Sequence, residues 1–116
     1  MEKLIEKKCV PCDRRVQPFT ETQIKEYLSQ LKTEWEVLDN KKIKKQFKFK
    51  NFKDAIAFVN KVAELAEQEG HHPDITINYN RVTIELFTHA IGGLSENDFI
   101  LAAKIEQIYP LDKRLS

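Results

Sequence analysis

Two pairs of short segments with alternating apolar and polar residues constrain the fold of this chain most strongly. A period of two residues is typical of a strand with one buried face. The segments of each pair are separated by residues that suit a tight turn, Asn40 and Lys41 in the first pair and Asn80 in the second. The sequence therefore predicts two β-hairpins, one from residues 34–39 and 42–50 and the other from residues 74–79 and 81–89.

Three further segments carry apolar residues at helical spacing, and each begins at a residue that can cap a helix. Gly70 and Pro110 are well placed to end the second and third. The expected helices are 20–32, from Thr20 in a capping box with Gln23; 51–69, from Asn51; and the segment from Ser95 to Pro110. The order helix, hairpin, helix, hairpin, helix predicts an α+β domain, a four-stranded antiparallel sheet with three helices packed on one face.

Chain length and composition indicate one folded domain. The chain has 116 residues, of which 41% are hydrophobic and 32% charged, as is typical of a soluble globular protein. Residues 1–18 show no clear periodicity, so we expect them to form an N-terminal arm and residues 19–116 to form the single domain.

The charge balance and the N-terminal sequence exclude several classes of partner and location. A formal net charge of +1 predicts neither nucleic acid nor an anionic membrane as a partner. No apolar run approaches the roughly 18 residues of a membrane span, and the N-terminus lacks the apolar region of a signal peptide. We therefore expect a cytoplasmic protein.

The two cysteines, Cys9 and Cys12, form a C-x-x-C pair. Such a pair can be half of a zinc site, a redox pair or two thiols without special function. A structural zinc site needs four ligands, and no second C-x-x-C or H-x3-H motif occurs. We expect both thiols to be structural or neutral, and dispensable for catalysis.

The segment EGHHPD, residues 69–74, places two histidines side by side between a glycine and a proline. Glu67 lies four residues before His71, and we expect it on the core-facing side of the helix, where its carboxylate can accept from an imidazole N–H. Pro73 holds His72 extended, so His71 and His72 should point in different directions. His89 ends the fourth predicted strand, beside the start of the third. All three histidines are thus predicted at the open end of the second hairpin.

Three interpretations of this cluster remain open from the residues alone. Histidines are common at surfaces and at helix ends, where they have no catalytic role. Three imidazoles and a carboxylate can also bind zinc, although adjacent histidines that point apart are awkward ligands of one ion. General acid–base chemistry is the interpretation that we favour, because imidazoles change charge near neutral pH.

These residues, in their order along the chain, resemble the pterin-4a-carbinolamine dehydratases. The resemblance runs from about residue 33 to residue 108 and includes QFKFKNFKDAIAFVNKVA before the histidines. Its motifs are Glu67-x3-His71-His72-Pro73, Tyr79-Asn80, Thr88-His89 and Gly93-Leu94-Ser95-Glu96-x-Asp98. Members of that family share the predicted order of helices and hairpins.

The resemblance implies dehydration of a 4a-hydroxy-tetrahydropterin to the quinonoid dihydropterin, a step of tetrahydropterin recycling, without metal or organic cofactor. It implies that His71 and His89 are the acid–base groups and that His72 positions the pterin. Glu67 would orient the neighbouring histidine, and Asp98 would support His89 or the edge of the site. The implied substrate-binding residues are Gly70, His71, His72, Phe87, Thr88, His89 and Ala90. A homodimer or homotetramer is implied as well, and unpaired sheet edges favour it.

The chain departs from the pattern of that family at two positions. Ile75 stands where an aromatic residue often follows the H-H-P-x motif, and Asn97 stands where an arginine can occur, which leaves the identity of the pterin side chain open.

The resemblance also implies an alternative function, a non-enzymatic dimerisation module, because some animal relatives are partners of a homeodomain transcription factor. An RNA-binding role for the lysines of residues 42–50 is less favoured, because no aromatic stacking motif accompanies them. We expect those lysines to block edge-to-edge aggregation and Trp35 to lie in the core.

Overall fold

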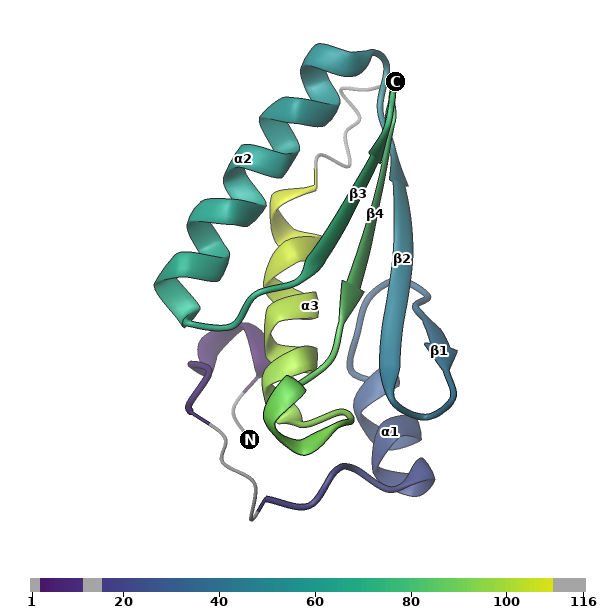
Figure 1. Cartoon of the computed structure of the whole chain (residues 1–116), viewed down its shortest axis with the longest axis vertical. Helices are drawn as coiled ribbons and strands as arrows, with labels where there is room; N and C mark the ends of the chain where they lie inside the picture. Colours follow the sequence, from purple (N-terminus) through teal and green to yellow (C-terminus); the bar gives the residue numbers. More distant parts are fainter. Residues whose placement is uncertain (1–2, 12–15, 110–116) are drawn as a thin grey trace.

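The computed structural model describes residues 3–11 and 16–109 of the chain (Figure 1). It confirms the predicted order of helix, hairpin, helix, hairpin and helix, and adds two short 3₁₀ helices, η1 and η2. The elements are η1 (Leu4–Glu6), α1 (Glu21–Leu28), β1 (Glu36–Leu38), β2 (Lys42–Lys48), α2 (Phe52–Glu69), β3 (Asp74–Asn78), β4 (Arg81–Leu86), η2 (His89–Ile91) and α3 (Glu96–Ile108).

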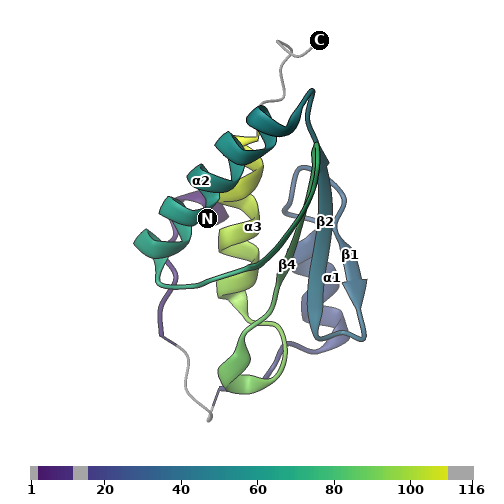
Figure 2. The same ribbon diagram turned by 45° about the horizontal axis from the view of Figure 1, so that its top comes forward.

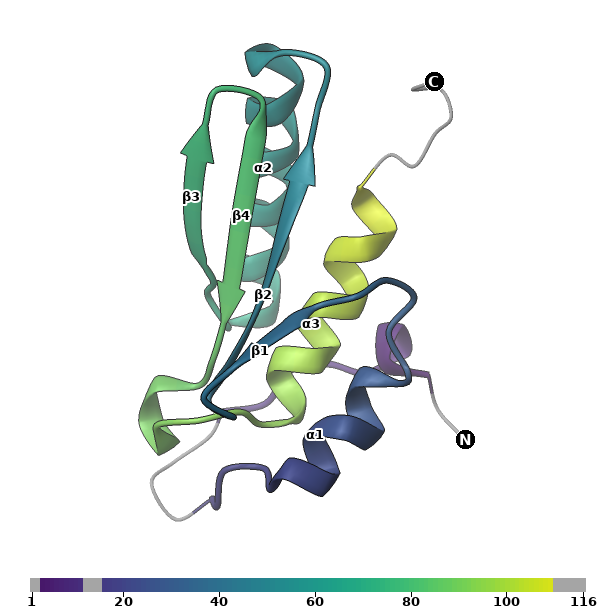
Figure 3. The same cartoon turned by 90° about the vertical axis from the view of Figure 1, so that its right-hand side faces the viewer.

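The four strands form one antiparallel sheet in the order β1-β2-β4-β3 (Figure 3). The two hairpins therefore join through β2 and β4, where Ile43 pairs with Leu86 and Phe47 with Val82. These four side chains are buried, because the period of two places them on the same face of the sheet. The predicted fold class, with three helices on one face of a four-stranded antiparallel sheet, is confirmed.

Helix α3 is the centre of the helical layer. It packs against α2, α1 and η1, and the views in Figures 2 and 3 show it between α2 and α1. Nine of its residues are buried, among them the polar Asn97, Asp98 and Glu106. Helix α2 buries a single row instead, consisting of Ala55, Phe58, Val62 and Ala66. Within the described residues no helix combines the length and apolarity needed to cross a bilayer.

The predicted helix boundaries hold where a side chain or a glycine defines them. Thr20 and Gln23 form the expected capping box, Oδ1 of Asn51 accepts from the backbone N–H of Asp54 at 2.8 Å, and Gly70 ends α2 in the left-handed conformation with φ of 67°. The first helix stops at Leu28 rather than at residue 32. Pro110, the expected end of the third helix, lies outside the described residues, as does Cys12.

Glu106 explains why the chain leaves the helical conformation after Leu28. Its buried carboxylate accepts from the backbone N–H of Lys32 at 3.0 Å and of Thr33 at 2.8 Å, from the Thr33 hydroxyl, and from Nε1 of Trp35 at 3.0 Å. These donors are then satisfied by α3 instead of by a longer α1. Trp35 is buried in the core, as predicted.

Candidate active site

The end of α2 and the start of β3 form the first part of the site. Gly70 turns the chain after α2, and the backbone N–H groups of Gly70 and His71 both donate to the carbonyl of Ala66, at 2.8 and 3.3 Å. Pro73 then leads into β3 at Asp74. This short connection holds His71 and His72 at the end of the sheet, next to the loop that follows β4.

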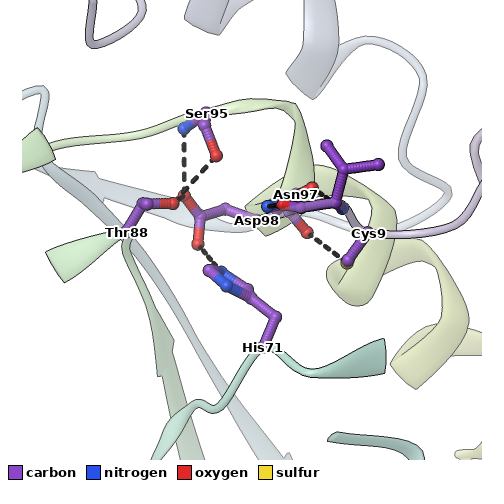
Figure 4. A network of polar contacts seen from close by, with 7 residues as sticks. Cys9, His71, Thr88, Ser95, Asn97 and Asp98 are labelled. Carbon is purple, nitrogen blue, oxygen red and sulfur yellow. Dashed lines mark hydrogen bonds and ion pairs between the residues drawn. The ribbon is translucent and has the colours of Figure 1, made fainter. Parts of the chain in front are cut away.

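His71 forms the buried histidine–carboxylate pair of the site. Its Nε2 lies 2.6 Å from Oδ1 of Asp98, whose side chain is 0% exposed (Figure 4). The other carboxylate oxygen, Oδ2, accepts from the Thr88 hydroxyl at 2.9 Å and from the backbone N–H of Ser95 at 3.0 Å. The Asp98 carboxylate is therefore held by α3's own first turn, by the loop after β4 and by the histidine.

This network determines which way the protons point. With Asp98 ionised, its carboxylate only accepts hydrogen bonds, and the Nε2 of His71 is then the donor to it. The Thr88 hydroxyl donates to Asp98, so it accepts from the Ser95 hydroxyl 2.8 Å away. Nδ1 of His71 is then the ring nitrogen that remains for exchange with a bound molecule.

Asp98 was predicted to support His89 or the edge of the site, and support of His89 is wrong. The carboxylate bonds to His71 instead. The loop after β4 explains the difference, because Thr88 pairs with Gly93 and the turn between them carries His89 away from the start of α3. Gly92 closes this turn with φ of 65°, a conformation that favours glycine.

His72 forms a second, exposed pair with Glu67. Its Nε2 lies 2.7 Å from Oε2 of Glu67, and the two side chains are 60% and 77% exposed. The opposite directions predicted for His71 and His72 are thus present in the structure. The predicted core-facing position of Glu67 is wrong, because the buried row of α2 continues from Ala66 toward Glu69 rather than toward Glu67.

His89 lines the same pocket from the loop after β4. It begins η2, three residues beyond the end of β4, whereas the sequence placed it at the end of the strand itself. Its ring packs against Phe87 with 4.2 Å between the ring centroids. Phe87 also contacts the ammonium of Lys42, which lies 5.0 Å from the centroid of its ring. The imidazole is exposed at the surface and supported on one side by an aromatic ring.

A pocket of ≈ 390 Å³ lies between these groups. All the residues that the sequence suggested for substrate binding line it, and its further lining residues come from the connection between α2 and β3, from β3, from α3 and from the N-terminal segment. The lining residues are Val10, Pro11, Gly70, His71, His72, Pro73, Asp74, Phe87, Thr88, His89, Ala90 and Asn97. Glu67 and Asp98 do not line the pocket, but each bonds to a histidine that does.

Two larger depressions, of ≈ 830 and ≈ 850 Å³, lie near α1 and contain no histidine. The smaller pocket is the better candidate because His71, His72 and His89 all line it. Among the described residues, no three His, Cys, Asp or Glu side chains are placed so that they could hold a metal ion together.

Sequence reasoning missed three contributors to this site. Ser95 was predicted only as a helix cap, yet its hydroxyl and backbone N–H both belong to the Asp98 network. Val10 and Pro11 line the pocket although they were predicted in an N-terminal arm. No local pattern marks Val10 and Pro11, because the segment that carries them is held by residues distant in the chain, Glu69 at Cys9 and Asn97 at Val10.

A family model and a similar sequence both point to the same protein family. Residues 17–108 match the family model described as pterin 4 alpha carbinolamine dehydratase. A protein of Alkaliphilus metalliredigens, provisionally named a pterin-4-alpha-carbinolamine dehydratase, is 49% identical over 107 residues, which are 92% of this chain and 96% of that protein.

Two solved structures share the fold. The crystal structure of a transcriptional coactivator/pterin dehydratase from Brucella melitensis is similar with a TM-score of 0.75 and 36% identity, covering 81% of this chain and all of that one. A pterin dehydratase-like RuBisCO assembly factor of the alpha-carboxysome has a TM-score of 0.60 and 24% identity over 70% of this chain and 95% of its own. At that identity the second likeness concerns the fold alone.

Proposed function

This chain belongs to the pterin 4 alpha carbinolamine dehydratase family, and on that basis we propose that it dehydrates a 4a-hydroxy-tetrahydropterin to the quinonoid dihydropterin. The observation that carries the proposal is the His71–Asp98 pair, in which a fully buried carboxylate fixes one nitrogen of an imidazole at the wall of a pocket. A purely structural histidine has no need of such a pair beside two further imidazoles.

The reaction needs two proton transfers and no change of oxidation state. The C4a–O bond breaks as the leaving hydroxyl takes up a proton, and the lone pair of the adjacent ring nitrogen forms the new C=N bond as its own proton departs. Water and the quinonoid dihydropterin are the products. Such a step would be part of tetrahydropterin recycling.

In the proposed mechanism, His71 and His89 transfer these protons. They line the same pocket from different segments, the connection after α2 and the loop after β4. A flat ring between them can therefore exchange protons on two sides. His72 contributes a polar contact that positions the pterin, and Glu67 limits the movement of the His72 ring.

Asp98 is a positioning residue in this mechanism. By accepting from Nε2 of His71 it fixes the tautomer, and its charge stabilises the imidazolium that forms when His71 takes up a proton. Thr88 and Ser95 hold the carboxylate in turn. The seven lining residues suggested by the sequence would then surround the ring.

Turnover of synthetic 4a-hydroxy-tetrahydropterin by the Asp98→Asn variant tests this proposal. The amide would keep an oxygen toward Thr88 and Ser95 and turn an N–H toward His71, which forces the opposite tautomer. We expect kcat to fall by about 10²–10⁴-fold with a smaller change in KM. Asn60→Ala on the exposed face of α2 is the matched control, and circular dichroism reports folding.

The competing function is the non-enzymatic interaction module. It is suggested by the coactivator part of the name of the Brucella melitensis protein. A parental protein that binds pterins but does not accelerate the dehydration would favour this alternative. Activity that a metal chelator abolishes would instead support the zinc interpretation of the histidine cluster.

A further inference from the structure

The N-terminal strap, which we define as residues 3–11, supplies one side of the histidine pocket. Leu4 and Cys9 bury their side chains against the helices, whereas Val10 and Pro11 line the pocket and Val10 is 62% exposed. The family model begins only at residue 17, so the strap lies outside the part of the chain that the model matches.

The side chain of Asn97 holds the strap at Val10 through two hydrogen bonds. Its Oδ1 accepts from the backbone N–H of Val10 at 3.0 Å, and its Nδ2 donates to the carbonyl of Val10 at 2.5 Å. Asn97 is 5% exposed and directly precedes Asp98 in the first turn of α3. One amide therefore fixes both backbone polar groups of Val10 relative to the Asp98 network.

Glu69 holds the preceding strap residue. Its Oε1 accepts from the backbone N–H of Cys9 at 2.9 Å, and its Oε2 pairs with Nζ of Lys104 at 2.5 Å. Glu69 is the last residue of α2, directly before Gly70. The strap is thus tied to the two helix ends that present His71 and Asp98.

We propose that the strap determines which pterins the pocket accepts, with Asn97 as the residue that positions Val10 and Pro11 as an apolar wall. This inference rests on the proposed function and concerns the substituent of the pterin ring. The edges of the ring carry many donors and acceptors, which the histidines can satisfy. Val10 and Pro11 offer no side-chain hydrogen bond, so they suit the substituent and limit its size.

The first arm of the test uses Cys9 to report whether the strap is in place, independently of any pterin. Burial, followed by the negative charge of Glu69, raises the pKa of the Cys9 thiol to about 12. While the strap is docked, Cys9 therefore reacts slowly with thiol reagents. In a Cys12→Ser background Cys9 is the only thiol. Asn97→Ala should speed its labelling at least about tenfold, whereas Val10→Ala and the control Asn60→Ala should leave it slow.

The second arm measures binding of two 7,8-dihydropterins, one with a methyl and one with a benzyl group at C6, by fluorescence. We expect the parental protein to bind the methyl compound more tightly. Asn97→Ala and Val10→Ala should both improve binding of the benzyl compound relative to the methyl compound, by about threefold to tenfold, as expected for a few apolar groups. Val10→Ala keeps the backbone groups that Asn97 binds, so it tests the wall separately from its anchor.

Each contrary result overturns a defined part of the proposal. Slow labelling of Cys9 in Asn97→Ala would remove Asn97 as the anchor. A second contrary result is a ratio of the two affinities that stays unchanged in Val10→Ala and in an Asn97→Ala variant whose Cys9 is labelled quickly. That result would show that the strap does not determine specificity. Absence of binding by either pterin to the parental protein would overturn the proposed function and the substrate class together, while the labelling result would still decide the anchoring.

Discussion

The two histidine–carboxylate pairs at the pocket differ in burial, and burial determines how strongly each carboxylate can act. The Asp98 side chain is 0% exposed and the Glu67 side chain 77%. Charges interact more strongly where water is excluded, and exposed pairs contribute little. Asp98 should therefore constrain His71 firmly, whereas Glu67 should only bias the orientation of His72.

The exposed pair gives a prediction about binding rather than turnover. His72→Ala should raise KM more than it lowers kcat, because in the proposed mechanism the ring positions the substrate without transferring a proton. Glu67→Gln should change kcat/KM by less than about threefold, as expected for an exposed ion pair. Steady-state kinetics of both variants checks this. A loss of kcat in His72→Ala as large as that in His71→Ala would show that His72 takes part in the chemistry.

The residue pattern predicted the three histidines at one pocket and a histidine partner for Glu67, but it placed Glu67 on the core-facing side of the helix and offered His89 as a partner of Asp98, which bonds to His71 instead. Pro73 and the period of an extended chain were sufficient to predict the opposite directions of His71 and His72. Glu67 was placed on the core-facing side because the face of α2 that was expected to be buried is the wrong one near the end of the helix. Its buried residues, Ala55, Phe58, Val62 and Ala66, place Glu69 on the buried side and Glu67 in solvent.

Among the elements, the helix ends were predictable because each depends on a few adjacent residues. Thr20 with Gln23, Asn51 and Gly70 act at the positions that the sequence indicated. The end of α1 was not predictable, because it depends on Glu106, about 75 residues later in the chain. The strap escaped prediction for the same reason, since its partners Glu69 and Asn97 are distant in sequence.

The contact between α2, α3 and the strap gives a prediction about stability and pH. Burial opposes ionisation of Glu69, but the hydrogen bonds from Cys9 and Lys104 outweigh it, so the pKa of the Glu69 carboxyl lies below its ordinary value. A carboxyl with a lowered folded-state pKa stabilises the fold fully above its unfolded-state pKa and loses this contribution as the pH falls through the folded-state pKa.

Glu69→Gln should accordingly lower the free energy of unfolding by about 2 kcal/mol at pH 7, the magnitude typical of hydrogen bonds to a charged group. The difference from the parental protein should shrink once the pH falls below 4.5, the ordinary pKa of a glutamate, and vanish below the lowered folded-state pKa. Urea unfolding at a series of pH values measures it, with Glu64→Gln on the exposed side of α2 as control. A difference that stays constant down to pH 3 would contradict the assigned role of the ion pair.

At the scale of the whole molecule, the sequence predicted a sheet with helices on one face. It did not predict the order of the strands, because that order depends on how the two hairpins pack together. The central pair β2–β4 leaves β1 and β3 at the two edges of the sheet. On β3 and in the turn after it, Ile77 and Tyr79 remain 38% and 66% exposed. An edge strand with exposed apolar side chains is a surface that a second copy of the chain can cover.

We therefore predict that the protein is a homodimer or homotetramer in solution. Light scattering at micromolar concentration should give two or four times the 13.6 kDa of one chain. Ile77→Lys should shift the mass toward the monomer if β3 forms the contact, because a lysine on an edge strand disfavours edge-to-edge pairing. A parental protein that remains at 13.6 kDa would contradict the prediction.

The central claim is that the histidine pocket carries out the dehydration, and the most direct test is turnover of 4a-hydroxy-tetrahydropterin by His71→Ala, His89→Ala and the double variant. We predict that each single substitution lowers kcat by about 10²–10⁴-fold with a smaller effect on KM. The double variant should lose less than the product of the two, because one imidazole can partly replace the other. A double variant that is folded by circular dichroism and turns over at the parental rate would contradict the account.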